Sequence, residues 1–71
     1  MKRVEAYINF LWVVGEIEGK IKTLYTWSSQ MINEDEVTVN ALVGGIHQKL
    51  EELRDYVGKR VEMYRMMGEE V

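Results

Sequence analysis

Apolar side chains recur every three or four residues through the first half of the chain, and this spacing places side chains on one face of an α-helix. Two acid–base pairs with the i,i+4 spacing that favours a helix, Glu16–Lys20 and Glu18–Lys22, lie in the same segment. The pattern predicts a helix over about 3–32. Its buried face is expected to comprise Tyr7, Phe10, Val14, Ile17, Ile21, Leu24, Ser28 and Met31.

The same segment also fits a β-hairpin, because apolar and polar residues alternate over much of 4–27. Glu18-Gly19 would form the turn, and Phe10 would pair with Trp27 across the two strands. Leu11 and Val13 argue against this alternative, since they would place apolar side chains on the polar face of the hairpin. The helix is favoured, and a β-hairpin followed by one long C-terminal helix remains the alternative.

The second half of the chain has a clearer amphipathic pattern. Charged residues between 48 and 59 fall on other faces than the apolar series, as expected for a helix with one buried face. Arg60 interrupts the series once. The pattern predicts a helix over about 37–67 whose buried face comprises Val39, Val43, Ile46, Leu50, Leu53, Val57, Tyr64 and Met67.

A polar break, Asn33-Glu34-Asp35-Glu36, separates the two predicted helices. Asn33 is expected to end the first helix in a left-handed conformation, and Asn33 or Thr38 to cap the second. The acids would stabilise the positive N-terminal end of the second helix. A connection this short makes the helices antiparallel neighbours, so the predicted fold is an all-α helical hairpin forming one domain, 1–71.

Glycines inside the predicted helices need a reason, because each costs about 1 kcal/mol relative to alanine. Gly44-Gly45 either breaks the second helix or makes room for large side chains, Tyr25 and Trp27, of the first helix. Both interpretations stay open at the level of the sequence.

The apolar surface of the first helix is wider than one neighbouring helix can cover. Val4, Ile8, Leu11 and Trp12 lie about 100° around the helix from its main apolar face. These four residues are the predicted oligomer interface, and two hairpins would pack there into a four-helix bundle. A homodimer is favoured because two-fold symmetry is the commonest form of self-assembly. A different protein partner would satisfy the same requirement.

Composition supports the need for a partner. The chain has 71 residues, no cysteine and no proline, and a net charge of −3. A domain this small seldom buries enough surface to be stable alone, and disulfides are excluded. The acidic balance makes nucleic acid an unlikely partner in general.

The N-terminus has the outline of a targeting segment, because Met1-Lys2-Arg3 precedes an apolar run. That run is too short to span a bilayer, which needs about 20 apolar residues, and Glu5 and Asn9 interrupt it. We therefore expect no membrane association and a cytoplasmic location.

Candidate chemistry is sparse. His47 is the only histidine, and Glu51 follows it at i+4, a spacing that could hold two metal ligands. A zinc site needs at least three protein ligands, so we expect a simple His47–Glu51 pair. The sequence predicts no metal site, no cofactor and no enzymatic activity.

Two further surfaces are candidates for binding a partner. Arg60, Met63, Arg65 and Met66 form a candidate partner surface, because methionines adapt to varied partners. Basic residues also gather at the open end of the hairpin, where Lys2 and Arg3 would approach Lys59, Arg60 and Arg65. The expected function is therefore that of a small interaction protein acting through a helical-bundle surface. The alternative is a hairpin-dimer nucleic-acid-binding regulator that uses the basic end.

Overall fold

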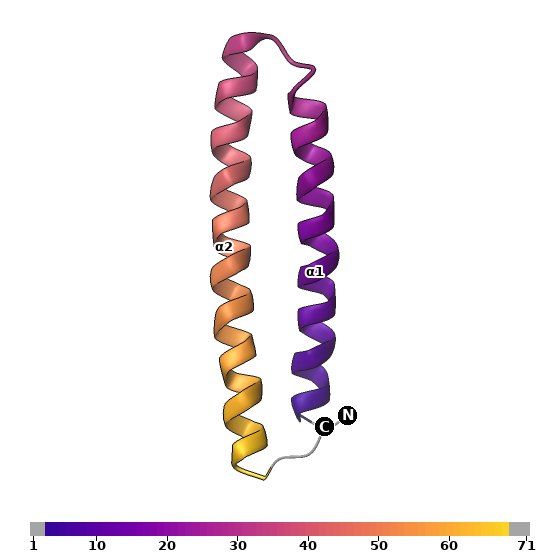
Figure 1. Cartoon of the computed structure of the whole chain (residues 1–71), viewed down its shortest axis with the longest axis vertical. Coiled ribbons are helices and arrows are strands. Elements are labelled where there is room, and N and C mark those ends of the chain that lie inside the picture. Colours follow the sequence, from indigo (N-terminus) through magenta and orange to yellow (C-terminus); the bar gives the residue numbers. More distant parts are fainter. Residues whose placement is uncertain (1–2, 69–71) are drawn as a thin grey trace.

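The chain forms two long antiparallel helices joined by a short turn, α1 (Arg3–Ser28) and α2 (Asn33–Met66), as Figure 1 shows. The structure is a computed structural model, and it describes residues 3–68. The predicted helical hairpin is confirmed. The β-hairpin alternative is wrong, because residues 4–27 lie within α1 and the described residues contain no strand. Neither helix, over residues 3–68, has a stretch both long and apolar enough to cross a membrane.

The turn lies earlier than predicted. α1 ends at Ser28 rather than near residue 32, and α2 begins at Asn33 rather than near residue 37. Asn33 does not adopt the left-handed conformation, since no described residue other than a glycine has a positive φ. The cap position of α2 is Ile32, which makes no side-chain capping bond. The acids nevertheless fall in the first turn of α2, where they favour its positive end.

Side chains spaced alternately by three and four residues form the seam between the helices. On α1 all of them are buried or half-buried, and on α2 Arg54 alone is more exposed. This spacing is typical of two helices whose axes are nearly aligned, as in an antiparallel coiled coil. The α1 row is Val4, Tyr7, Leu11, Val14, Glu18, Ile21, Tyr25 and Ser28. The α2 row is Glu36, Asn40, Val43, His47, Leu50, Arg54, Val57, Val61 and Tyr64.

Half of the predicted seam is confirmed and half is wrong. Every seventh residue from Tyr7 on α1 and from Val43 on α2 lies in the seam as expected. The other predicted row of α1 is replaced, so that Glu18 lies in the seam where Ile17 was expected. α2 is rotated in the same sense, and Ile46 is left half exposed. Both helices are therefore turned so that Glu18 of α1 and the polar α2 residues Asn40, His47 and Arg54 face inward, while an apolar row of each helix faces outward.

The glycines do not interrupt the helices. α2 continues through Gly44-Gly45 and Gly58 to Met66, so the interpretation that Gly44-Gly45 breaks the helix is wrong. A methyl group placed on Gly44 would lie 3.7 Å from the Tyr25 hydroxyl, an ordinary van der Waals distance, so Gly44 adjoins Tyr25 but an alanine would fit there too. Nothing lies within 4 Å of the corresponding position at Gly45 or Gly58, and the packing explanation does not extend to them.

Candidate interaction surfaces

One broad side of the hairpin carries most of the apolar side chains that the seam leaves outside. Nine of the fifteen large hydrophobic side chains exposed over residues 3–68 lie on this side, and Val39 beside them is half-buried. A groove lined by Phe10 from α1 and by Tyr56 from α2 shows that both helices contribute to it. We define the apolar face as Phe10, Val13, Ile17, Leu24 and Trp27 of α1 with Val39, Leu42, Ile46, Leu53 and Tyr56 of α2.

The apolar face is regular along both helices. Phe10, Ile17 and Leu24 follow one another at seven-residue intervals, as do three residues of α2 from Val39 to Leu53. The outer edge of the face repeats in the same way, and within 13–27 and 42–56 its only charges are those of Lys20 and Lys49. No acidic residue occupies these positions. Lysine can lay its aliphatic stem along an apolar surface and keep its ammonium group in water, so both edges are compatible with an apolar contact.

The opposite side of the hairpin is lined by glycines and polar groups, and we call it the glycine face. It is defined by Gly15 and Gly19 of α1 and by Gly44 and Gly58 of α2. A groove on this side is lined by Gly15, Glu18, Gly19, Ile21, Lys22, Tyr25, His47 and Arg54. The polar half of the seam therefore opens onto this side.

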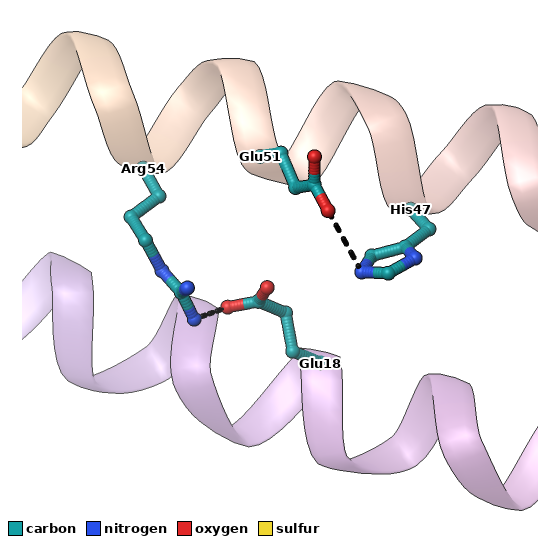
Figure 2. A network of polar contacts seen from close by, with 4 residues as sticks. All are labelled: Glu18, His47, Glu51 and Arg54. Carbon is teal, nitrogen blue, oxygen red and sulfur yellow. Dashed lines mark hydrogen bonds and ion pairs between the residues drawn. The ribbon is translucent and has the colours of Figure 1, made fainter.

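Polar side chains on the glycine face are paired with one another (Figure 2). Arg54 of α2 donates to the carboxylate of Glu18 on α1, and this ion pair links the helices near their middle. His47 lies 3.3 Å from the Glu51 carboxylate, so the predicted His47–Glu51 pair is present. No group of three or more potential metal ligands occurs within residues 3–68. The arrangement here is a set of structural contacts between and along the helices.

A second polar contact crosses the seam next to the turn. The Ser28 hydroxyl donates to the side-chain oxygen of Asn40 at 2.5 Å and also contacts the Tyr25 carbonyl at 3.0 Å. Ser28 is 1% exposed, so this polar group is buried together with its partners. Because a buried hydroxyl without a partner is costly, the Asn40 side chain explains why serine is tolerated in the seam.

The predicted oligomer interface does not form one exposed patch. Val4 is completely buried in the seam of a single hairpin, and Leu11 is half-buried there. Ile8 is half-buried, whereas Trp12 is 71% exposed beside it on the glycine-face side. Val4 and Leu11 therefore need no second copy to cover them. A contact of Ile8 and Trp12 with another chain stays a prediction.

Aromatic and basic side chains cluster at the open end of the hairpin, away from the turn. The rings of Tyr7 and Tyr64 meet edge to face with centroids 5.5 Å apart, and this contact joins α1 to α2. Arg60 donates to the Tyr64 hydroxyl at 2.8 Å, and the guanidinium groups of Arg3 and Arg60 lie over the Tyr64 ring. Such cation–π contacts hold the cations against the protein.

Hydrogen bonding in this cluster shifts the pKa values of the two phenols, Tyr7 and Tyr64, in opposite directions. The hydroxyl of Tyr7 bonds to that of Tyr64, which lowers the pKa of Tyr64, and the bond from Arg60 lowers it further. The same bond raises the pKa of Tyr7, because its proton is held in the contact. The bond to Tyr64 also raises the pKa of Arg60. The arrangement therefore keeps Arg60 cationic and directed at Tyr64.

The predicted partner surface is divided between two environments. Arg60 and Met63 are half-buried, and the Arg60 guanidinium approaches the Met63 sulfur at 3.8 Å. Arg65 and Met66 are exposed, and Met66 is the most exposed of the large hydrophobic residues at 88%. The structure thus brings Arg60 and Met63 together and leaves the other two in water. Binding of a partner by these four residues remains a prediction.

The sequence pattern does not predict the apolar face as a separate surface. It predicts instead that five of its residues lie in the seam: Phe10, Ile17, Leu24, Ile46 and Leu53. The signal that could have revealed the face is the pair of apolar rows on each helix, since one helix neighbour covers only a narrow stripe. Comparison of the chain with protein-family models, curated proteins and solved structures finds no match.

Proposed function

We propose that this chain is a small non-enzymatic interaction protein whose working surface is the apolar face. The observation that carries the proposal is where the large side chains lie. The seam buries six hydrophobic residues, four of them valines, while Phe10 and Trp27 lie outside it on one side. Contiguous apolar surface of this extent on a small domain is typical of a binding site.

The composition of the face supports the same proposal. Protein interfaces are enriched in aromatic residues and depleted of charge at their centres. The centre of the apolar face contains Ile17 and Leu24 of α1 with Ile46 and Leu53 of α2, and its aromatic residues stand towards its ends. The face is also built on two helices held together by a seam, so it is presented as a rigid surface to another helical surface.

The polar groups support a structural rather than a catalytic role. Ser28 is buried and hydrogen-bonded, which is unsuited to a nucleophile that must reach a substrate. Glu18 is paired with Arg54, and His47 is paired with Glu51. These side chains stabilise the hairpin in pairs.

Nucleic-acid binding by the open end has weaker support. Two of its cations, Arg3 and Arg60, lie over the Tyr64 ring. Lys59 lies 3.0 Å from the Asp55 carboxylate. Phosphate binding would require these groups to exchange contacts that they already make, and the net charge of the chain is negative.

A photo-crosslinking experiment tests the proposal with a matched control. Trp27 on the apolar face and Trp12 on the other side have similar exposure, 66% and 71%. Each is replaced in turn by benzoylphenylalanine, and the full chain is irradiated in living cells. The proposal predicts that the probe at position 27 captures a protein, either this chain or another, far more efficiently than the probe at position 12. Equal capture at both positions, or capture only at position 12, would contradict it.

A further inference from the structure

We propose that the occupant of the apolar face is a second copy of this chain, stacked face to face with the turn of one hairpin at the open end of the other. This inference rests on the proposed function and specifies its partner. The product is an antiparallel four-helix bundle in which α1 lies against α1 of the partner and α2 against α2.

The area of the face fits such a dimer. The hairpin measures 53 by 16 by 12 Å, and the apolar face and the glycine face lie on its two broad sides, one of which is in view in Figure 1. The whole broad side, of which the apolar face is a part, has a projected area of about 850 Å². A stable interface of standard size buries about 800 Å² on each partner. A second hairpin covers the whole face, whereas a single helix would leave one of its two rows uncovered.

The spacing of the α1 row makes that row complementary to itself. Ile17 lies midway between Phe10 and Leu24 and close to the middle of α1. A two-fold axis through this point places Ile17 next to its own copy and Phe10 next to the partner's Leu24. The ring of Phe10 then meets a smaller side chain on both sides of the axis.

The distribution of charge selects the antiparallel stack. Three acids, Glu34, Asp35 and Glu36, lie at the turn, and residues 23–48 contain no lysine or arginine. At the open end, residues 3–10 and 57–68 carry four basic and two acidic side chains. An antiparallel stack puts the acidic turn of each copy beside the more basic end of the other. A parallel stack would bring the two acidic turns together, and like charges in contact disfavour association.

The test uses purified full-length protein and two pairs of variants. Sedimentation equilibrium should give twice the chain mass of 8.4 kDa for the natural chain. Leu24→Asp should raise the dimer dissociation constant at least 100-fold. The neighbouring Thr23→Asp, which lies on the side of α1 away from α2 and outside the apolar face, should leave that constant within a factor of two to three. Circular dichroism checks that both variants remain helical.

Cysteine crosslinking tests the orientation without relying on a disruptive variant. The chain has no cysteine, so each introduced thiol is the only one present. Mild oxidation of Ile17→Cys should give a covalent dimer in high yield, because the two thiols meet at the two-fold axis. Thr23→Cys should remain monomeric under the same conditions.

The outcomes separate this inference from the proposed function. A natural chain that sediments as a monomer, or an Ile17→Cys dimer that fails to crosslink, overturns the antiparallel self-association. If the probe at position 27 still captures a different protein in cells, the proposed function stands with another partner. If neither self-association nor capture from the apolar face is seen, both fail. A dimer that survives Leu24→Asp but is lost on Trp12→Asp would place the interface on the glycine-face side and also overturn the inference.

Discussion

The two broad sides of the hairpin are built from the same helices but have opposite chemistry. The apolar face has two regular rows of large side chains and two lysines at its edges. The glycine face has four glycines and the paired polar groups Glu18, Arg54, His47 and Glu51. Large exposed apolar side chains are fewer on the glycine-face side, where Trp12 lies, than on the apolar face, which carries nine of them. The apolar face is therefore the surface that the proposed partner would cover.

The seam between the faces explains how this division arises. A polar residue of α1 enters the seam where α2 offers it a specific partner, as Arg54 does for Glu18 and Asn40 for Ser28. The Tyr25 hydroxyl lies next to Gly44 of α2. Because these groups occupy the seam, an apolar row of each helix is turned outward. The hairpin therefore buries less apolar surface internally and exposes more of it on the apolar face.

The largest expected effect distinguishes the seam from the apolar face. Leu50 is buried in the seam, so Leu50→Ala should lower the free energy of unfolding by about 2–5 kcal/mol. Leu53 lies three residues away on the apolar face, and the loss on Leu53→Ala should grow with protein concentration because it weakens a contact between copies. Urea denaturation at several protein concentrations measures both. Losses at Leu53 that do not depend on concentration would show that this side chain acts only within one hairpin.

Leu50 and Leu53 also show how much of the fold can be predicted from the sequence. Both are expected in the seam, but only Leu50 is buried there. The two helices and their antiparallel order follow from periodicity and a short polar turn, which are local features. The rows beginning at Tyr7 and Val43 could be assigned to the seam correctly, because each row faces the other helix in the predicted and in the observed rotation. The other half of the seam could not, because the tolerance for Glu18 depends on Arg54, 36 residues away. A pattern within one helix carries no information about such a partner, and the apolar rows were placed in the seam for that reason.

Glycine substitutions test whether the glycine face is free of contact with another chain. Nothing lies within 4 Å of a methyl group placed at Gly15 or Gly58, so Gly15→Ala and Gly58→Ala should each raise the free energy of unfolding by about 0.5–1 kcal/mol. Gly44→Ala brings a methyl group within 3.7 Å of the Tyr25 hydroxyl, and it is the packed control with a smaller gain. Thermal unfolding of the three variants gives the comparison. Destabilisation at Gly15 would mean that another chain packs closely against this side.

The ion pair across the glycine face should contribute less. Arg54 is largely exposed, and exposed ion pairs contribute about 0.2–1 kcal/mol. A double-mutant cycle of Glu18→Gln and Arg54→Gln should give a coupling energy in this range, and added salt should reduce it. The Lys59–Asp55 pair, which lies within α2, is the control for a purely local pair. A coupling energy of zero would show that the Glu18 side chain is tolerated in the seam for another reason.

The smallest effect is spectroscopic and concerns Tyr7, Arg60 and Tyr64 at the open end, which belong to neither face as defined above. The bond from Tyr7 lowers the pKa of Tyr64 and the same bond raises the pKa of Tyr7, so Tyr64 should ionise at lower pH than Tyr7. An ultraviolet titration should lose an early phenol ionisation in Tyr64→Phe and a late one in Tyr7→Phe. Removal of Arg60 by Arg60→Gln should raise the pKa of Tyr64. The reverse order of ionisation would contradict the direction of the hydrogen bond.

The two tryptophans provide the most direct measurement of whether the apolar face is the working surface. Trp12→Phe leaves Trp27 as the only tryptophan, and Trp27→Phe leaves Trp12, and the two residues are similarly exposed in a single hairpin. We predict that acrylamide quenches the fluorescence of Trp12 freely, whereas Trp27 is protected and emits at shorter wavelength in the assembled protein. Equal quenching of the two tryptophans, or protection of Trp12 alone, would contradict this account.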